Sequence, residues 1–321
     1  MSTIRVCEDI ADCTSVWGRL VPQTSLFDLW DVRACFQRHF RHRPYFLVAE
    51  GPNGPRGLLP LSYLDESESY GYFPGETWSG KTWLEQNRLY GDSTEICQEL
   101  LDNCPPETHL RYLVPETLQT FPDTDLDEVG YLFYPARYGF EMENYWQEFS
   151  GKGRKKLQRE IDEISAPGLS VRENCFDDVQ ILLEMNLRAF GERSYFLDER
   201  FRSGFGSLMA MLHERGWLRI TTVLLGGEVA AVDVGGVYNN AYTVLAGGTD
   251  GRFQGVAKVI NLQHLAWACR QRLESVDFLC GSFGWKDRFH LTPRPLYQIK
   301  ISAGQICHQA HAVAETVGDV A

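Results

Sequence analysis

The sequence predicts a mixed α/β fold with two lobes, each a largely antiparallel sheet flanked by helices, and a cleft between the lobes. The chain has 321 residues, 44% of them hydrophobic, which suffices for two moderate cores. Its second half follows the order helix, strand, helices, antiparallel strands, helix and strand, and its first half holds a strand-turn-strand unit. We therefore expect an N-terminal lobe over 1–140 and a C-terminal lobe over 141–321.

The first half alternates short helical and extended patterns without a low-complexity linker. Its clearest unit is a pair of strands joined by a turn of glycine, proline and asparagine, which indicates a β-hairpin. A later stretch is dense in glycine and aromatic residues and suits an ordered loop better than a regular element. In chain order, we expect a helix over 27–40, the hairpin over 43–64, the loop over 68–91, a helix over 93–104, a strand over 109–115 and an acidic turn over 122–128.

The second half opens with a helix that Ser150 can cap and whose apolar stripe is Leu157, Ile161 and Ile164. Further helices and a run of strands joined by tight turns follow. In chain order, we expect a strand over 169–174, helices over 177–190 and 197–216, strands within 217–248 that turn at Gly226-Gly227 and Asn239-Asn240, a helix after Gly255, and a strand from 275 that leads into a basic and aromatic loop.

Charge and cysteine content argue against several classes of protein. The formal net charge is −12, and residues 1–140 hold 11 Lys and Arg against 21 Asp and Glu, so general coating of nucleic acid is not expected. Nine cysteines without a CxxC or a paired Cys/His spacing indicate reduced, mostly buried thiols and no metal site. The charged N-terminus and the lack of a long apolar run indicate a cytoplasmic protein without membrane insertion.

One helix start has the features of a phosphate site. Arg252-x-x-Gly255-x-Ala257 stands where a turn becomes a helix, and the first N–H groups of a helix lack partners and carry partial positive charge. Gly255 has no Cβ to hold a pyrophosphate away, and the small Ala257 allows close packing on a strand. A plain turn before an apolar helix has the same pattern, so both interpretations stay open at this point.

Three segments together resemble one known superfamily. They are SGKGRKKLQREI in the helix after Ser150, FQGVAKVI at the helix start of Gly255, and VDFLCGSFGWKDRF after it. These segments are similar to motifs of the GNAT superfamily of N-acetyltransferases, in its two-lobed BioF2-like acetyltransferase branch, which is related to the Fem-type aminoacyltransferases of peptidoglycan bridges. The chain departs from the branch at Phe253-Gln254, where Ser-Pro is frequent, and at Trp285, where the branch usually has tyrosine.

The resemblance implies a donor site for acyl-CoA as co-substrate, with aminoacyl-tRNA as the alternative, and it requires no metal. Five cations between Lys152 and Arg159 lie near a helix start, where the dipole disfavours positive charge; phosphate binding and a plain solvated face both remain open for them. The residues expected to bind the carrier are Arg252, Gln254, Gly255, Val256, Ala257, Lys258 and Arg154.

The resemblance also makes Lys286 a catalytic candidate. A lysine there can neutralise a phosphate or the oxyanion of a tetrahedral intermediate, or it can simply lie across Trp285 with its charge in solvent. Transfer to nitrogen further needs a group that removes a proton from the amine. Asp233, within an otherwise apolar run, and Tyr242 are the preferred candidates for that group, with Tyr238 and Asp250 behind them.

Acceptor binding is expected to involve Tyr72 and Trp78 of the glycine-rich loop, together with Trp285 and Arg288, although the loop aromatics also suit packing between lobes. The sequence thus predicts an N-acyltransferase, a monomer or homodimer, that acts on an amine of a small molecule, sugar or peptide. One alternative is an aminoacyl-tRNA-dependent transferase that binds a tRNA acceptor end. Another is a non-catalytic GNAT-like binding module.

Overall fold

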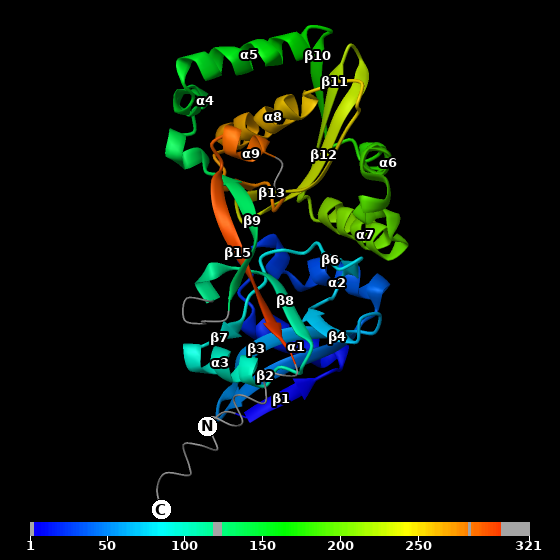
Figure 1. Cartoon of the computed structure of the whole chain (residues 1–321), viewed down its shortest axis with the longest axis vertical. Helices are drawn as coiled ribbons and strands as arrows, with labels where there is room; N and C mark the ends of the chain where they lie inside the picture. Colours follow the sequence, from blue (N-terminus) through cyan, green and yellow to red (C-terminus); the bar gives the residue numbers. More distant parts are fainter. Residues whose placement is uncertain (1–2, 118–123, 282–283, 303–321) are drawn as a thin grey trace, which may run out of the picture. The chain divides into compact units, whose positions relative to one another are not determined.

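The computed structural model describes residues 3–117, 124–281 and 284–302 (Figure 1). The described residues form two compact units, one made of 3–23, 27–128 and 295–302 and the other of 24–26 and 129–294. This division differs from the expected one at 140/141. The reason is that residues 129–140 join the second core, where Phe133 and Tyr138 stack on each other and pack against Tyr145.

The first unit holds a sheet in which the strands follow the order β1-β2-β3-β4-β8-β15. All neighbours are antiparallel except β4 and β8, which are parallel. The core centres on Trp17, Phe46 and Phe73, each fully buried. The elements are β1 (Thr3–Cys7), α1 (Ile10–Leu20), α2 (Trp30–Phe40), β2 (Arg43–Gly51), β3 (Gly54–Leu64), β4 (Ser69–Tyr72), β5 (Thr77–Trp78), β6 (Lys81–Thr82), β7 (Tyr90–Gly91), α3 (Thr94–Asp102), β8 (Thr108–Leu113) and β15 (Thr292–Ile301).

The second unit holds strands in the order β9-β14-β13-β12-β11-β10, in which only β13 and β14 are parallel. Helices α8 and α6 cover opposite faces of this sheet (Figure 1). The elements are β9 (Asp125–Phe133), α4 (Met142–Tyr145), α5 (Gly151–Ser165), β10 (Leu169–Glu173), α6 (Asp178–Phe190), α7 (Glu199–Glu214), β11 (Leu218–Leu225), β12 (Glu228–Tyr238), β13 (Ala241–Thr249), α8 (Val256–Gln271), β14 (Ser275–Asp277) and α9 (Trp285–Arg288).

The two units repeat one order of elements. In the first, β1, α1, α2, β2, β3, β4, α3 and β8 follow each other, apart from the short strands β5, β6 and β7. In the second, β10, α6, α7, β11, β12, β13, α8 and β14 do the same, so that β4 and β8 correspond to β13 and β14. In both units the parallel pair is joined through a helix, as a crossover between parallel strands requires. The prediction of a mixed α/β chain with two largely antiparallel, similarly built halves is confirmed; the cleft between them stays a prediction.

Most predicted elements are present. The 43–64 hairpin forms, and Ser150 caps α5 by accepting a hydrogen bond from the N–H of Gly153 at 3.1 Å. Two predictions were wrong. The segment 68–91 is not only loop, because it contains β4, whose four residues are too few to show a period. The acidic segment is strand β9 from Asp125 onward, while residues 122–123 lie outside the described part.

Eight cysteines lie in the described part of the chain, where none forms a disulfide and six are buried. Cysteine therefore serves mainly as a small core residue there. Among the described helices, none has the length and apolar character needed to cross a membrane.

Candidate active site

Two neighbouring strands of the second unit run parallel for a short distance and then separate. The last pair between β13 and β14 is Thr243 with Asp277, whereas β13 continues to Thr249. On its other edge β13 pairs with β12, and a register shift leaves Leu245 as the extra residue of a bulge. Beyond Thr243, β14 no longer occupies the edge of β13. A backbone edge of this kind can form strand-like hydrogen bonds with an extended ligand.

Helix α8 begins just after this parted pair, at Gly255. The φ of Gly255 is 82°, in the left-handed region that favours glycine, and a Cβ there would lie 3.1 Å from Cδ1 of Ile164. The glycine therefore serves both the turn and the close approach of α5. A cavity of about 520 Å³ adjoins it, lined by Glu160, Glu163, Ile164, Leu225, Phe253, Gln254, Gly255 and Lys258.

The cations predicted to bind phosphate are paired with carboxylates. Lys258 donates to Glu160 at 2.7 Å, and this hydrogen bond lowers the pKa of the Glu160 carboxyl. Arg252 bonds Glu228 at 2.7 Å and Asp250 at 2.8 Å. These charges balance within the site, so a phosphate there has to compete with carboxylates for both cations.

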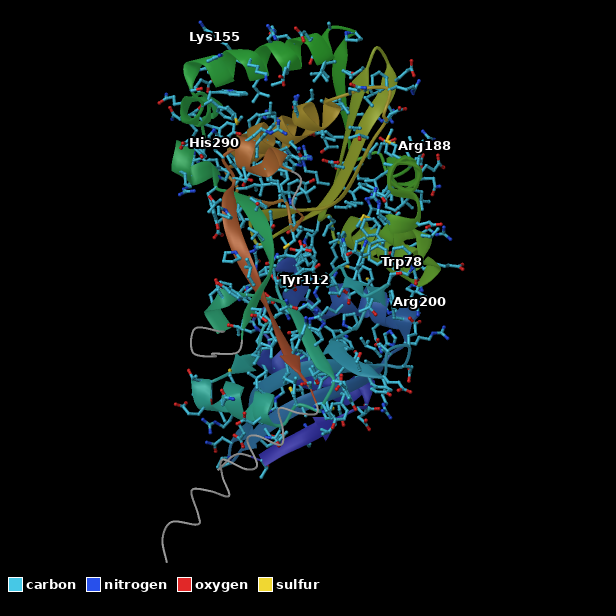
Figure 2. The ribbon with its side chains drawn as sticks, in the orientation of Figure 1. Trp78, Tyr112, Lys155, Arg188, Arg200 and His290 are labelled. Atoms are coloured by element: carbon cyan, nitrogen blue, oxygen red, sulfur yellow. The ribbon has the colours of Figure 1, made fainter. Side chains whose placement is uncertain are left out.

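The other residues predicted for the carrier take different places. Val256 is 1% exposed and packs against the apolar side of α5, so it serves the core. Gln254 lines the cavity. Ala257 is half-buried in the first turn of α8, and Arg154 is half-buried in the first turn of α5. The exposed Lys155, also on α5, lies at the outer surface of the second unit (Figure 2).

A buried polar pair lies beneath α8. Oδ2 of Asp233, on β12, accepts a hydrogen bond from Nε2 of His264, on α8, at 2.9 Å, and the residues are 6% and 0% exposed. Because a carboxylate only accepts, Nε2 carries the proton and Nδ1 of a neutral ring is an acceptor. That Nδ1 has no hydrogen-bond partner among the described residues. Asp233 also faces β13, since a Cβ on Gly247 would lie 2.4 Å from its Oδ1.

Tyr242 and Arg219 complete this cluster. The Tyr242 ring centre lies 5.3 Å from that of His264, and burial holds the pKa of its hydroxyl well above the ordinary value, so Tyr242 is not a base near neutral pH. The guanidinium of Arg219 lies close enough to oppose this rise in pKa, although no atom of the described residues meets hydrogen-bond geometry with the hydroxyl. The guanidinium of Arg219 stacks 4.0 Å from the Trp267 ring and bonds Glu173 at 2.7 Å. The two predicted residues Asp233 and Tyr242 thus meet in one buried cluster.

Lys286 lies on α9 and is 3% exposed. Its Nζ donates to the carbonyl oxygens of Phe278, Leu279 and Cys280 at 3.0, 2.8 and 3.0 Å. These bonds hold the backbone that turns away from β13. A direct catalytic role for Lys286 stays a prediction. In this arrangement its Nζ fixes the backbone that follows β14, where β14 separates from β13.

The neighbours of Lys286 support the same turn. Trp285 packs edge-to-face on Phe278 and Phe289, with ring centres 5.4 Å apart in each case. Arg288 donates to the carbonyl of Gly284 at 3.0 Å and is exposed. Their predicted acceptor contacts stay predictions.

The predicted loop aromatics lie in the first unit. Tyr72 lines a pocket there and donates from its hydroxyl to the carbonyl of Arg88 at 2.8 Å. Trp78 lies on the neighbouring hairpin, half-buried, and does not line that pocket (Figure 2).

Sequence reasoning missed His264 and Arg219. The one available signal was a histidine on the apolar face of a predicted helix, opposite a strand that carries an aspartate. Among the described residues, no group of three or more His, Cys, Asp and Glu side chains is arranged to hold a metal ion.

Comparison with known proteins gives a domain match over part of the chain and a similar fold over nearly all of it. Residues 151–287 match the family model described as acetyltransferase (GNAT) domain. No curated protein sequence matches the chain.

Solved structures match nearly the whole chain. FemX matches with 10% identity and a TM-score of 0.58, over 95% of this chain and 99% of its own. L-PGS from Bacillus licheniformis matches with 8% identity and a TM-score of 0.54, over 92% and 93%. A tandem GNAT protein from the clavulanic acid biosynthesis pathway matches with 10% identity and a TM-score of 0.50, over 93% and 98%. Residues 151–287 are thus similar to the acetyltransferase (GNAT) domain, and the chain as a whole has a fold similar to those of FemX and the tandem GNAT protein.

Proposed function

We propose that this protein is an N-acyltransferase that moves an acyl group from acyl-CoA to an amine of a small molecule, sugar or peptide. The observation that carries the proposal is the parted β13–β14 pair with a bulge beside it and a glycine-initiated helix after it, inside the segment that matches the acetyltransferase domain. A thioester tail in extended form suits such a strand edge, and the helix start suits its phosphates.

The donor is proposed to bind with its phosphates beside Gly255, where the cavity already lies. Lys258 is the nearest cation, and its ammonium must exchange Glu160 for a phosphate. Arg252 must likewise exchange Glu228 and Asp250 for a phosphate. An anion that carries several charges can drive this exchange, whereas a neutral ligand cannot, because only the anion gains from the freed cations.

The transfer itself needs no metal. The amine nitrogen attacks the thioester carbonyl, the C–N bond forms, and the oxyanion is stabilised by backbone N–H groups on the edge of β13. The C–S bond then breaks, and the thiolate of CoA leaves. The proton that the amine gives up passes to the pair of Asp233 and His264, whose free Nδ1 is an acceptor. Positioning of the two substrates supplies the remaining acceleration.

A second donor, aminoacyl-tRNA, is favoured by one feature. Lys152, Lys155 and Lys156 are exposed at the start of α5, and such a cluster suits the phosphates of an RNA end. The acidic lining contributed by Glu160 and Glu163 favours the smaller carrier instead, because an RNA brings more phosphates close to it.

The test is titration of the whole protein with acetyl-CoA, longer acyl-CoAs and a charged tRNA, in the wild type and in three variants. Glu160→Gln frees Lys258 and removes a like charge, so we expect acetyl-CoA to bind about three- to tenfold tighter. Lys258→Ala should weaken binding by a similar factor. Asp162→Asn, an exposed acid on the same helix outside the cavity lining, is the matched control and should change nothing. If no acyl-CoA binds, or Glu160→Gln does not tighten binding, the donor site is misplaced; preferential binding of the charged tRNA would support the second donor.

A further inference from the structure

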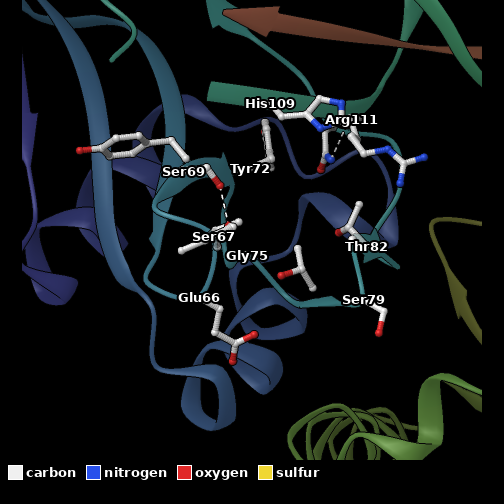
Figure 3. Close-up of a pocket in the computed structure, with 15 residues that line it drawn as sticks. Glu66, Ser67, Ser69, Tyr72, Gly75, Ser79, Thr82, His109 and Arg111 are labelled. Atoms are coloured by element: carbon white, nitrogen blue, oxygen red, sulfur yellow. Dashed lines mark hydrogen bonds between the residues drawn. The ribbon is translucent and has the colours of Figure 1, made fainter. Parts of the chain in front are cut away.

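The first unit carries a pocket at the position that corresponds to the parted strands of the second. β4 and β8 are the counterparts of β13 and β14, and they pair only at Tyr70↔Thr108 and Gly71↔His109 before they separate. Beyond that point lies a cavity of about 380 Å³ whose walls include Tyr72, His109 and Arg111 (Figure 3). The same backbone geometry thus appears twice in the chain, and here a cavity accompanies it.

Most residues that line this pocket are of polar types, and few are of charged types. Of fifteen lining residues, nine are Ser, Thr, Tyr, Asn or His, and only Glu66 and Arg111 are charged types. Figure 3 shows Ser67 and Ser69 joined by a hydrogen bond on one side of the cavity and Thr82 and Ser79 on the other. Such a wall offers many hydroxyl donors and acceptors to a ligand.

The two charged groups contribute little net field inside the pocket. Arg111 is bound to Asp127 through Nε and Nη2, the shortest contact being 2.7 Å, so its charge is matched. Glu66 is exposed at the rim. His109 bonds Gln298 at 2.9 Å, and burial lowers the pKa of its ring, which keeps it neutral near pH 7. The charged residues that line the pocket thus offer no buried, unmatched charge to a polyanion or a strong cation.

The crossover helix of this unit also differs from α8 at its start. Ser93 caps α3, and its hydroxyl accepts from the N–H of Ile96, so one of the free donors of the helix is taken. Asp92 and Glu95 flank the cap, and Asp92 is bound to Arg56 at 2.7 Å. The hydrogen bond from Ser93 lowers the pKa of Glu95, which stays negative. A carrier with phosphates is therefore disfavoured at this helix start, in contrast to Gly255.

The pocket is held by buried polar contacts. Arg33, 1% exposed, donates to Oδ1 of Asn87 at 2.8 Å, and Nδ2 of Asn87 donates to the carbonyl of Arg111 at 2.8 Å. Glu76 accepts from Thr82 and from the N–H groups of Trp83 and Leu84, which anchors the hairpin over the cavity. Asn87 keeps a second N–H and a second lone pair for a ligand. A wall fixed in advance lowers the entropy cost of binding.

We propose that this pocket of the first unit binds one uncharged, hydroxyl-bearing small molecule, a sugar or polyol about one ring in size. The volume lies at the lower end of the range of about 300 to 1,000 Å³ that is usual for small-molecule sites. The serine and threonine hydroxyls, Asn87 and His109 match alternating donors and acceptors of a polyol. All residues that line the pocket belong to the first unit, so its binding can be tested without any acyl donor.

The experiment is saturation-transfer NMR on the full chain, without any acyl donor, with glucose, N-acetylglucosamine, sorbitol and inositol as probes. Glucosamine and glucose 6-phosphate are the charged counterparts. We expect at least one neutral probe to bind, and its phosphorylated form to bind at least tenfold more weakly. Ser67→Ala combined with Ser69→Ala should weaken binding about fivefold, as the loss of one or two hydrogen bonds does. Thr77→Trp, which fills the cavity, should abolish it.

The controls separate this site from the rest of the protein. Ser170→Trp, at an exposed position of β10 in the second unit, should leave probe binding unchanged, and Thr77→Trp should leave acetyl-CoA binding unchanged. Circular dichroism checks that each variant is folded. The proposal is wrong if none of the neutral probes binds, if glucose 6-phosphate binds as tightly as glucose, or if folded Thr77→Trp still binds the probe. If acyl transfer alone fails, the proposal of a sugar or polyol site in the first unit is unaffected.

Discussion

The sharpest test of the proposed chemistry is Asp233→Asn. The side chain of asparagine has nearly the shape of aspartate and can still bond Nε2 of His264, which now lies 2.9 Å from Oδ2 of the carboxylate. The contact with Gly247 is also kept, since no atom is added. We therefore expect the free energy of unfolding to change by less than about 1 kcal/mol.

The expected loss of activity is far larger than this change in stability. If the pair of Asp233 and His264 takes the proton of the amine, removal of the carboxylate should lower kcat by about 10² to 10⁴, which corresponds to roughly 3 to 5 kcal/mol in the barrier. The KM for acetyl-CoA should stay within about threefold, because the proposed phosphate contacts lie at Gly255 and Lys258. Release of CoA with an amine acceptor, followed at saturating donor, measures both constants.

Asp233→Ala provides the matched comparison. It leaves both ring nitrogens of the buried His264 without a partner among the described residues, so we expect a loss of about 1 to 3 kcal/mol in urea unfolding. A total stability of about 5 to 15 kcal/mol tolerates that loss. If Asp233→Asn keeps kcat within threefold of the wild type, the pair is a structural element of the core and the proton goes elsewhere.

Three further predictions concern residues near the two sites. Tyr242→Phe should change the free energy of unfolding by less than about 1 kcal/mol and leave kcat unaffected. The reason is that the hydroxyl meets hydrogen-bond geometry with no atom of the described residues and stays protonated. A large loss of kcat would instead identify Tyr242 as a catalytic group. Lys286→Met should cost about 3 kcal/mol in urea unfolding, since three carbonyls lose their donor, and an unchanged midpoint would contradict the role given to Nζ. Burial raises the pKa of Glu76 above its ordinary value of 4.5, so the folded state favours the protonated form and its contribution to stability is lost as pH rises above 4.5. Glu76→Gln should therefore flatten the pH dependence of the unfolding free energy and be more stable than the wild type at pH 7; equal pH profiles would show that the three hydrogen bonds outweigh the burial.

Much of the fold could be predicted because its signals are local. The turns at Gly226-Gly227 and Asn239-Asn240 and the cap at Ser150 each rest on a few adjacent residues. β4 was not predicted, because four residues that include a glycine show no alternation of polar and apolar side chains. It forms a strand because it pairs with its neighbours β3 and β8. The pairing of β9 with β14 and of β15 with β8 also has no local signal, because the paired residues lie more than 140 positions apart in the sequence.

The candidate site was less predictable, because its pairs are distant in sequence. Asp233 was singled out as a carboxylate in an apolar run, yet its partner His264 is 31 residues away on another element. Arg252 and Lys258 carried the right charge at the right helix start, but the carboxylates that pair with them come from β12, a turn and α5. A sequence shows which side chains can bind a phosphate; only the fold shows which of them are already bound to something else.

The repeated order of elements gives a common structural basis for the two ligand sites that we propose. A parallel pair joined through a helix separates wherever the second strand stops pairing, so the gap is a property of the topology and not of particular side chains. What differs is the chemistry around each gap. Gly255 and Lys258 lie at the start of α8, whereas Asp92 and Glu95 lie at the start of α3. Several hydroxyl-bearing residues line the cavity beside β4 and β8, the strands that α3 connects. These charges favour the proposed phosphate-bearing donor in the second unit and the proposed uncharged molecule in the first, and they require no difference in backbone.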